Sequence, residues 1–516
     1  MGFILAASGS AIGLGNIVMF SSNAYRFGGG AFYLPYFIAL FLVGMPVMVA
    51  EFGLGASTRK SFPLAMRVAG GRAGEFAGWF AILNAGFITM YYITILGWVA
   101  GMAWGALTTD VTASFGASAK PPFFDSFKMT YGPFFGVVLV WILNLLIVSR
   151  GTKSIEPVVK VFLPLMWLAM IVLVFVGMSL PGGFEGVKVL FTPQPEVLGD
   201  LSVWQGALSQ MFFSLSLGFG VMTAYASYLP KDSDLTHNAV TTSLLNCGFE
   251  WIAGVAVFSI LFSFAIAPSS STIAMMFYVV PAGIAAMPFA AKAFAIGFFL
   301  LLLVAGLTSS ISLLEALVAA GQDKFRLPRW RTLAIFGTVG VIGSLVFALP
   351  AAALPGLPLG LWLLDLTDHW AFGYGLLIVG LVECIVIGWV VGSGRIRDFV
   401  NANSRFRLGV WFDLLLRFVI PGLLLMILIS AVSQGEAGGL YGTKTDFSKT
   451  EGILGSFLRV SPWVVFLVWM LGGGGLAWWL SGRRGVEEGL PDLEAPLPSG
   501  PGVRSAGEGT AGEVDS

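Results

Sequence analysis

Long apolar runs separated by short polar segments make up most of this sequence. Each run is bounded by glycine, proline or charge, and about twelve of them have the roughly twenty residues that a helix needs to cross a bilayer. Because an open strand cannot satisfy its backbone in lipid, the pattern predicts an all-α polytopic membrane protein with about twelve transmembrane helices. The runs lie at about 2–24, 30–57, 77–107, 131–149, 155–180, 203–228, 238–267, 292–320, 332–351, 361–392, 409–433 and 461–481.

Two segments depart from this pattern. Residues 268–291 combine a run of serines with prolines, which predicts a structured external loop rather than a span. From 482 to 516 the composition turns to glycine, proline, serine and glutamate, which cannot bury a core. We therefore expect a transmembrane domain over 1–481 and a disordered cytoplasmic tail over 482–516.

Lysine and arginine gather in the loops that follow the second, fourth, eighth and tenth runs, and the cytoplasm retains loops of this kind. The opposite loops, such as 110–128 and 436–451, contain fewer basic residues or mix them with acids. This asymmetry predicts a multi-pass protein of the inner or plasma membrane with both termini in the cytoplasm. The basic residues are Arg59, Lys60, Arg67, Arg72, Arg150, Lys153, Lys324, Arg326, Arg329, Arg331, Arg395, Arg397, Arg405 and Arg407.

Composition excludes several classes of protein. Charged residues make up 11% of the chain, whereas about a quarter is usual in a soluble protein. The formal net charge is +0, so overall basicity gives no reason to expect a nucleic-acid partner. Cys247 and Cys384 lie in apolar runs and the two histidines stand far apart, which argues against a disulfide framework or a zinc site. Since no nucleophile, base and orienting acid converge, we expect neither an enzyme nor an organic cofactor.

Two of the apolar runs are interrupted by glycine and polar residues, at 7–16 and at 214–220. Glycine lets the backbone leave the helix, and freed carbonyl groups are tolerated in a bilayer only where they line a cavity or bind something. Gly9-x-x-x-Gly13 is also a helix-packing motif, and for a lone instance packing is the simpler interpretation. Two interruptions at equivalent places, both with hydroxyls, favour a transporter binding site near the midplane of the membrane.

Other polar residues also lie inside apolar runs. The eighth run contains a cluster at 305–310, but hydroxyls in membrane helices often bond only to the preceding turn, so this cluster alone leaves both interpretations open. Asn246 and Glu250 lie one turn apart in the seventh run, where an ionisable residue is a functional hypothesis. Half-helix N-termini suit an anionic group, while unwound carbonyls and side-chain oxygens suit a hard cation such as sodium.

Together these stretches resemble the neurotransmitter:sodium symporters, and most closely their bacterial amino-acid transporters of the leucine-transporter type. The resemblance implies two inverted repeats of five helices, about 2–180 and about 203–392, with helices one and six unwound. Two extra helices would follow at about 409–481. The segments that carry the resemblance are 9–16, 28–32, 91–92, 210–228 and 305–310.

By this resemblance, the protein is a sodium-coupled symporter that imports a neutral, hydrophobic amino acid by alternating access. The alternatives are a non-transporting amino-acid sensor on the same scaffold and a symporter for another small zwitterion. The expected partners are the amino acid, two sodium ions and the lipid bilayer. The expected assembly is a monomer or a homodimer.

The resemblance also implies a residue set for each site. The first sodium ion would bind the substrate carboxylate together with Ala11, Asn16, Ser214 and Asn246. The second sodium ion would bind Gly9, Ile12, Ala305, Thr308 and Ser309. The substrate would bind Ala11, Leu14, Gly15, Ile88, Tyr92, Phe213, Ser214, Ser216, Phe219, Ser309 and Leu313.

Animal members of the family bind chloride beside the first sodium site, whereas chloride-independent bacterial members supply a carboxylate there. Glu250 stands at that place, with Tyr36 and Gln210 expected around it, so the resemblance implies chloride-independent transport. The monoamine members carry an acid where this chain has Gly13, which disfavours biogenic amines as substrates.

The gates depart from the family pattern. The arginine of the outer gate pairs with an acid that matches Asp368, but Met19 stands in place of that arginine. Arg26 could replace the missing arginine as the partner of Asp368, although its spacing in the sequence does not require this. Otherwise, closure over the substrate would rest on Tyr92 and Phe213.

The inner gate would use Asp323, supported by Tyr228, with an arginine that precedes the first helix in relatives. Because the sequence begins within that helix, we expect Met1 to be an internal methionine, with a truncated, leaky or inactive protein as the alternative.

Overall fold

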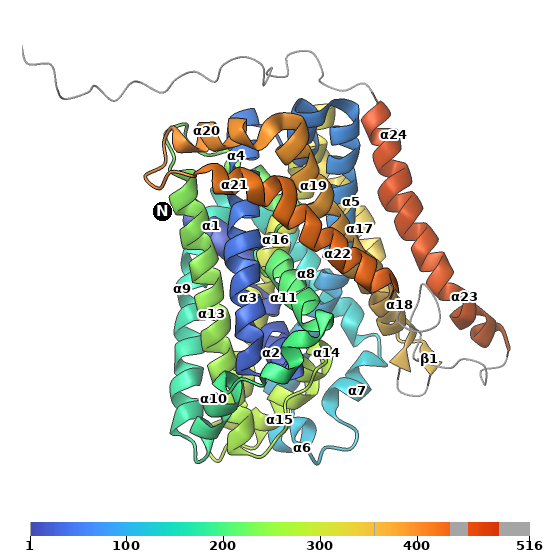
Figure 1. The fold of residues 1–516 in the computed structure, drawn as a ribbon. Coiled ribbons are helices and arrows are strands. Elements are labelled where there is room, and N and C mark those ends of the chain that lie inside the picture. The colour runs from blue at the N-terminus through green and yellow to red at the C-terminus, as the bar shows by residue number, and fades with distance from the viewer. Residues whose placement is uncertain (1, 355–356, 434–451, 484–516) are drawn as a thin grey trace, which may run out of the picture.

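The computed structural model describes residues 2–354, 357–433 and 452–483. In this part of the chain nine helices are long and apolar enough to cross a membrane, or up to ten if one bent pair forms a single span. Figure 1 shows the long helices gathered into one bundle. The chain is therefore a helical, multi-span membrane protein, as the apolar runs predicted. Within the described residues the only sheet is one short antiparallel pair of strands.

The bundle is built from many helical segments, several of which continue one another through a π-helical turn. The elements of the first half are α1 (Gly2–Ala11), η1 (Gly15–Met19), α2 (Phe20–Arg26), η2 (Gly30–Phe32), α3 (Tyr33–Ala39), η3 (Leu40–Gly44), α4 (Met45–Thr58), α5 (Phe62–Thr108), α6 (Val111–Phe115), α7 (Phe123–Lys128), α8 (Gly132–Val148), α9 (Thr152–Ser179), α10 (Gly183–Phe191), η4 (Pro195–Gly199), α11 (Leu201–Ser214), α12 (Val221–Ala226) and α13 (Leu235–Ser263). Those of the second half are α14 (Thr272–Ala274), η5 (Met275–Val279), α15 (Val280–Ala285), α16 (Ala291–Phe325), α17 (Arg329–Phe347), β1 (Ala352–Leu354), β2 (Leu357–Pro358), α18 (Leu359–Asp368), η6 (His369–Gly375), α19 (Leu376–Ile385), η7 (Val386–Gly392), α20 (Ser393–Asn401), α21 (Val410–Leu414), η8 (Leu415–Val419), α22 (Ile420–Ser433), α23 (Gly452–Trp469), η9 (Met470–Gly475) and α24 (Leu476–Gly482).

The helices differ from the predicted runs in a few places. α5 begins at Phe62 rather than near 77, because Gly70 and Gly71 leave helical geometry and join two helices at a kink. The segment 268–291, predicted as a structured loop, contains the short helices α14, η5 and α15. Residues 484–516 of the predicted tail and the acidic loop at 436–451 lie outside the described residues.

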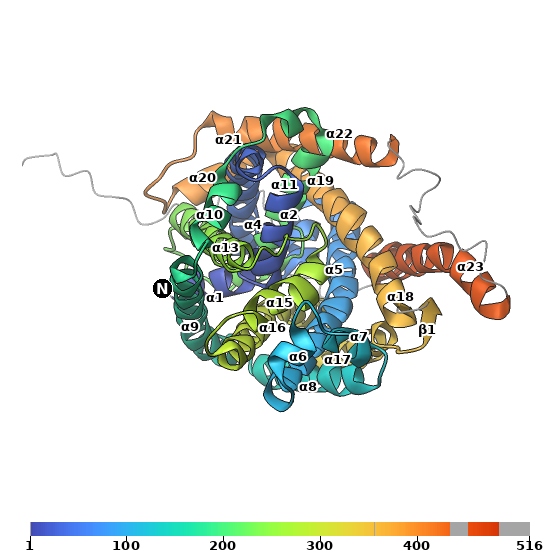
Figure 2. The same cartoon turned by 90° about the horizontal axis from the view of Figure 1, so that it is seen from below.

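Both predicted interruptions leave the helix. α1 and the helix formed by η1 and α2 are bent by 56° across residues 12–14. Between α11 and α12 the φ angles of Ser216, Gly218 and Gly220 are 55°, 74° and 70°. Glycine adopts this left-handed backbone at no steric cost, so these glycines permit the second break. α1 packs against α9, α13 and α16, and α2 lies beside α11 and α13 inside the bundle (Figure 2).

A polar cluster joins α7 to η5, two segments that are not among the membrane spans. Tyr278 donates a hydrogen bond to Asp125 over 2.6 Å, and the Lys128 ammonium lies 2.7 Å from the same carboxylate oxygen. Burial by itself would raise the pKa of Asp125, but the bonds from Lys128 and Tyr278 hold that pKa below its ordinary value. The carboxylate therefore stays ionised and fixes the 268–291 segment to α7.

Small residues let two long helices approach closely. A Cβ atom at Gly136 of α8 would lie 2.3 Å from the carbonyl oxygen of Gly97 in α5. Such contacts allow membrane helices to pack backbone against backbone. On the outside of the bundle, large apolar side chains such as Phe135 and Phe175 are 78% and 71% exposed, as expected where lipid covers the surface.

We predict that Gly136→Val destabilises the protein by about 1–3 kcal/mol, the usual result of overpacking, because the side chain would meet backbone that cannot rotate away. Thermal unfolding of the purified protein in detergent measures this effect. Gly297→Val on α16 is the matched control, since a Cβ atom there meets nothing within 4 Å. Equal losses in the two variants would contradict the close packing of α5 and α8.

Candidate functional site

The two helix breaks face each other inside the bundle. The Ser216 hydroxyl donates to the carbonyl oxygen of Ser10 over 3.2 Å, which joins the end of α1 to the break between α11 and α12. The η1 turn that follows the first break packs against α11 and α13. Backbone groups released by both breaks therefore lie close together in the membrane interior, where polar partners must satisfy them.

A small cavity lies between these breaks, α5 and α16. Gly13 is required here, because a Cβ atom at this position would lie 2.5 Å from Ser309 Oγ and 2.9 Å from Tyr92 Oη. The Tyr92 hydroxyl accepts a hydrogen bond of 3.3 Å from the backbone N–H of Leu14. The lining residues are Ser10, Ala11, Gly13, Gly15, Asn16, Tyr92, Phe213, Ser214, Ser216, Phe219, Ser309 and Leu313.

Most residues expected to bind substrate meet at this cavity. Of that set, only Leu14 and Ile88 are not among the lining residues, and Ile88 lies buried one turn before Tyr92 on α5. Ser10 and Gly13 line the cavity but were not predicted to contact substrate. Ser10 was marked only by its position inside the glycine- and serine-rich run, whereas Gly13 was also the position where monoamine members of the family carry an acid.

Aromatic rings enclose one side of the cavity. The ring centroid of Phe213 lies 6.5 Å from that of Tyr92 and 6.3 Å from that of Phe219. Phe372 of η6 meets Phe213 edge to face with centroids 5.1 Å apart. Phe372 was missed because nothing in its apolar surroundings distinguishes it, and only packing brings η6 to this place.

Four residues assigned to the first sodium site converge beside the cavity. The Asn16 amide nitrogen lies 2.7 Å from one terminal atom of the Asn246 amide. That same Asn246 atom lies 3.2 Å from the carbonyl oxygens of both Ala11 and Ser214. As a nitrogen it donates to these carbonyls; as an oxygen it accepts from Asn16 and completes a cluster of three oxygens of the kind that binds a cation. The arrangement can therefore serve as a cation site with neutral ligands.

A second oxygen cluster joins α16 to the break after α1. Thr308 Oγ1 lies 2.8 Å from the carbonyl oxygen of Ala305 and 3.4 Å from that of Ile12. Ser309 Oγ lies 3.5 Å from the Ile12 carbonyl oxygen and donates to the Ser10 carbonyl oxygen over 2.9 Å. Four of the five predicted residues thus come together, with the Ser10 carbonyl added.

Gly9, the fifth residue of that predicted set, lies in α1, where a Cβ atom would meet Val159 of α9 at 2.5 Å. In the described part of the chain no hydrogen bond joins its carbonyl group to Thr308 or Ser309, so the close packing of α1 and α9 explains Gly9 better.

Glu250 is fully buried next to the first cluster. Its carboxylate accepts hydrogen bonds from Gln210 Nε2 over 2.8 Å and from Asn16 Nδ2 over 3.3 Å. The hydroxyls of Tyr36 and Ser214 donate to it as well. The structure therefore gathers Tyr36 and Gln210 around Glu250, as expected, and satisfies the carboxylate with neutral donors.

The residues assigned to the outer gate do not meet. In the described part of the chain, no ion pair joins Arg26 to Asp368, and the Arg26 guanidinium instead lies 5.1 Å from the ring centroid of Phe27. Asp368 is half-buried at the end of α18, next to η6. Phe213, which the sequence analysis named with Tyr92 for closure, contacts the rings of Tyr92 and Phe372.

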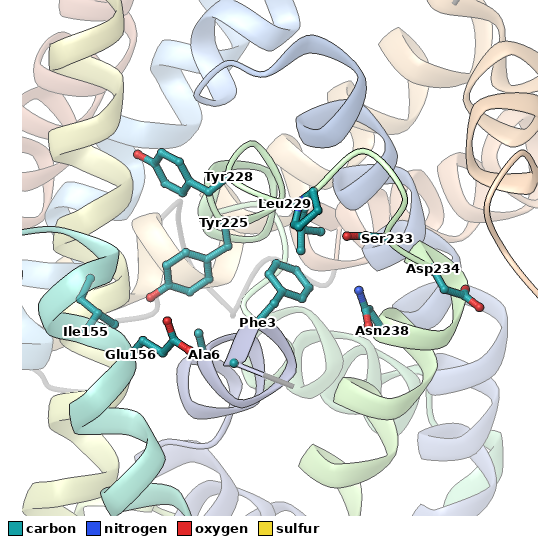
Figure 3. Close-up of a pocket in the computed structure, with 12 residues that line it drawn as sticks. Phe3, Ala6, Ile155, Glu156, Tyr225, Tyr228, Leu229, Ser233, Asp234 and Asn238 are labelled. Atoms are coloured by element: carbon teal, nitrogen blue, oxygen red, sulfur yellow. The ribbon is translucent and has the colours of Figure 1, made fainter. Parts of the chain in front are cut away.

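A larger cavity of about 520 Å³ lies between the start of α1, the start of α9 and the segment after α12 (Figure 3). Tyr228, assigned to the inner gate, lines this cavity and is 52% exposed. Asp323, its expected companion, interacts electrostatically with Tyr228 and accepts a hydrogen bond of 2.6 Å from the backbone N–H of Ser61. Tyr225 also lines the cavity, and its hydroxyl lies 2.6 Å from Ser312 Oγ.

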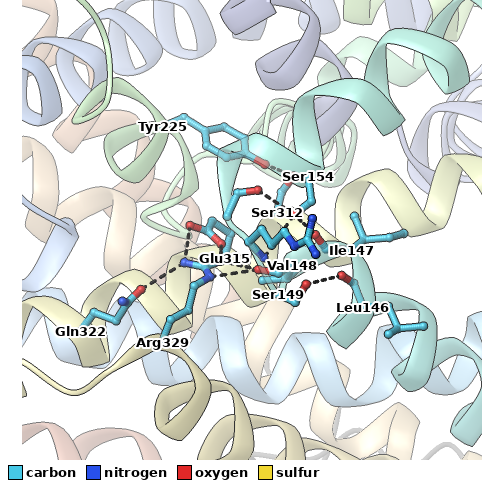
Figure 4. A network of polar contacts seen from close by, with 12 residues as sticks. Leu146, Ile147, Val148, Ser149, Ser154, Tyr225, Ser312, Glu315, Gln322 and Arg329 are labelled. Atoms are coloured by element: carbon cyan, nitrogen blue, oxygen red, sulfur yellow. Dashed lines mark hydrogen bonds and ion pairs between the residues drawn. The ribbon is translucent and has the colours of Figure 1, made fainter.

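Ser312 in turn donates to the carbonyl oxygen of Thr308 over 2.9 Å. The larger cavity therefore lies two hydrogen bonds from the second oxygen cluster, a connection that links residues far apart in the sequence and gave no signal in it. Figure 4 shows Tyr225 and Ser312 together with a neighbouring network around Arg329.

Arg329 of α17 holds the ends of two other helices. Its guanidinium donates to the carbonyl oxygen of Val148 at the end of α8 over 2.6 and 3.0 Å, and to Gln322 over 3.1 Å. It also pairs with Glu315 of α16, whose side chain is only 1% exposed (Figure 4). The arginine thus satisfies a buried carboxylate and a helix end at once.

We predict that Arg329→Met lowers the stability of the protein by about 3 kcal/mol, because it leaves the Glu315 carboxylate buried without its cation. Thermal unfolding in detergent measures the change. Arg331→Met is the control, since Arg331 lies over the exposed ring of Trp330 in the same helix. If both variants unfold at the wild-type temperature, the network has no structural role.

Comparisons with known proteins agree with this architecture. The model of the sodium:neurotransmitter symporter family matches residues 1–114 and 128–472. The chain is 39% identical over 468 residues to an uncharacterized sodium-dependent transporter of Methanocaldococcus jannaschii, covering 87% of this chain and 92% of that protein. It is 32% identical over 450 residues to another from Bacillus subtilis, covering 84% and 96%. The crystal structure of MhsT in complex with L-phenylalanine matches with a TM-score of 0.74 and 32% identity, over 83% of this chain and 98% of that chain.

Proposed function

The chain belongs to the sodium:neurotransmitter symporter family, and we propose that it imports a neutral, hydrophobic amino acid together with sodium. Membership makes it a sodium-dependent, multi-pass membrane transporter rather than an enzyme, as the sequence predicted. The observation that carries the finer proposal is the convergence of two neutral oxygen clusters on one cavity between two broken helices.

The substrate carboxylate would bind where the chain re-enters a helix after the first break. Gly15 is the first residue of that helix and Leu14 precedes it. Their backbone N–H groups lie at a helix N-terminus, which favours the binding of an anion. Tyr92, already bonded to the Leu14 N–H, would donate its hydroxyl proton to the same carboxylate. The amino group would face carbonyl oxygens of Ala11, Phe213 and Ser216.

The side-chain pocket favours an apolar substrate. Phe213, Phe219 and Leu313 line the cavity, and Ile88 lies behind it. No acid occupies the Gly13 position, so no carboxylate is present there to hold the cation of an amine that lacks a carboxyl group. The similarity to MhsT, whose structure contains L-phenylalanine, supports a hydrophobic amino acid.

Two sodium ions would occupy the oxygen clusters. Carbonyl, amide and hydroxyl oxygens are suitable ligands for a hard cation. The first ion would contact the substrate carboxylate, so substrate and sodium would bind together. The second would bind between α1 and α16, whose separation then depends on the ion.

We further propose twelve spans for the whole chain. The short apolar helix α8 and the broken pair α11–α12 would cross the membrane in addition to the spans counted above. Inverted repeats would then cover about 2–180 and about 203–392, with both termini in the cytoplasm and the protein in the cell membrane.

Thermal stability with a panel of amino acids in sodium or potassium salt tests the proposal. We expect stabilisation by hydrophobic amino acids in sodium only, about 2.7 kcal/mol at a ligand concentration 100 times the dissociation constant. Equal stabilisation in both salts would contradict sodium coupling. Uptake into proteoliposomes with an inward sodium gradient then separates transport from binding alone.

Two adjacent serines give a matched pair of variants. We predict that Ser309→Ala loses most of the sodium-dependent stabilisation, because Ser309 contacts the second oxygen cluster. Ser310→Ala should keep it, because the Ser310 hydroxyl bonds to Asn144 of α8 instead. A full sodium-dependent shift in the Ser309 variant would refute the second sodium site.

The buried carboxylate of Glu250 would replace chloride beside the first sodium ion. We predict that wild-type uptake is unchanged when gluconate replaces chloride, whereas Glu250→Ser uptake falls several-fold, since the serine removes the fixed negative charge. A Glu250→Ser variant that transports equally well in both salts would argue against this role.

A further inference from the structure

Two buried acids lie outside every site described above. Glu51 of α4 and Glu383 of α19 are 0% and 1% exposed, each within a helix that is long and apolar enough to cross the membrane. A carboxyl group at such a depth is costly and rarely retained without a role. Neither residue contacts the cavity or the two oxygen clusters.

Glu51 holds the break between α11 and α12. Its Oε1 atom accepts a hydrogen bond of 2.8 Å from the backbone N–H of Gly218, one of the residues with positive φ. The hydroxyl of Thr223 on α12 donates to the backbone carbonyl of Glu51 over 3.3 Å. The other carboxyl oxygen of Glu51 has no hydrogen-bond partner.

Glu383 reaches the same place from α19. A Cβ atom at Gly218 would lie 3.2 Å from Leu376 and 3.4 Å from Val379, so α19 packs directly on the break. Glu383 lies one helical turn after Val379, and its carboxyl interacts electrostatically with that of Glu51. Both oxygens of Glu383 are buried without a hydrogen-bond partner.

Basic side chains on the surrounding elements are directed elsewhere. Arg417 of η8 donates to the Gly388 carbonyl and to Ser393. Arg397 of α20 pairs with Asp413. Neither arginine therefore neutralises the pair.

The packed elements also carry Arg67 and Arg72 of α5, Arg395 of α20 and His369 of η6, but within the described residues no cation interacts electrostatically with Glu51 or Glu383. Glu250 of α13 is bound by its own donors, and Tyr225 of α12 bonds to Ser312. Tyr92 of α5 lines the cavity, with Tyr91 next to it in the sequence, and Cys384 follows Glu383 on α19.

Two adjacent carboxylates cannot both ionise in a medium of low polarity without a cation. One of them must hold a proton, and the N–H of Gly218 favours the ionised form of Glu51. We propose that Glu51 and Glu383 form a proton-binding site, in which a protonated Glu383 faces an ionised Glu51 that stabilises the break between α11 and α12. The ligand of this site is a single proton.

Loss of that proton would place two negative charges beside the break. Ser214, Ser216 and Phe219, at or beside this break, line the cavity. Deprotonation of Glu383 would therefore disturb the substrate site through the backbone of the break. Substrate binding should therefore weaken as the pH rises. This effect on substrate binding rests on the proposed function, whereas the binding of a proton by Glu51 and Glu383 does not.

Infrared difference spectroscopy tests the proton without any substrate. We expect Glu383→Gln to lose one protonated-carboxyl band that the wild type shows at neutral pH, and that band to disappear from the wild type on alkaline titration. Glu156→Gln, an exposed carboxylate paired with Lys160, should leave the band in place. An unchanged band in Glu383→Gln would overturn the proposal, even if amino-acid transport is established.

Thermal stability as a function of pH gives a second test. Wild-type protein should lose stability at alkaline pH by several degrees more than either Glu383→Gln or Glu51→Gln, because each variant removes one of the two charges. The glutamine in each case keeps the size of the side chain, and Glu51→Gln can still accept from Gly218. Should one variant fail to fold, the other answers the question. Identical alkaline profiles for wild type and the folded variant would overturn the proposal.

Discussion

Within a bilayer, every backbone N–H and C=O group needs a partner inside the protein. An unbroken helix meets this requirement alone, but α1 and the α11–α12 segment each stop in the interior. Their freed groups must be satisfied by one another, by side chains or by a bound ligand. The contact between Ser216 and the Ser10 carbonyl and the bond from Gly218 to Glu51 are two of these solutions. The cavity and the two oxygen clusters lie where the remaining groups meet.

Charge balance follows from the same constraint. The oxygen clusters consist of carbonyls, amides and hydroxyls, so a monovalent cation can bind and leave without stranding a protein charge. Glu250 is surrounded by neutral donors, which lets it lie beside the first cluster without an ion pair. By contrast, the buried acid Glu315 meets Arg329 near a helix end. In this protein, neutral donors satisfy the carboxylate of Glu250 inside the bundle, whereas an arginine satisfies that of Glu315 near a helix end.

Much of the fold was predictable because lipid imposes a length on each span. The apolar runs located most helices to within about five residues. The exceptions are places where glycines changed the direction of the chain, and α23, which begins at Gly452 rather than near 461. Gly70 and Gly71 form the kink in α5. The residues before this kink were predicted as a loop and those well after it as a span, whereas both are helical. Within the site, the glycine- and serine-rich run indicated the first break, while Phe372 and Tyr225 carried no signal. Their partners, Phe213 and Ser312, lie far away in the sequence, and the resemblance to a family supplied most of the residue assignments.

The amino-acid sequence by itself determined that this is a helical, multi-span membrane protein, where both helix breaks lie and which kind of polar groups the breaks expose. These depend on local composition and on the backbone freedom of glycine. Only the tertiary structure decided which exposed groups meet. Ser309 and Ser310 are identical neighbours, yet one faces the second oxygen cluster and the other faces Asn144, because successive residues of a helix point in different directions. Likewise, Glu51 and Glu383 become a pair only where α4 and α19 close around Gly218, since packing between distant helices, and not local pattern, sets their separation.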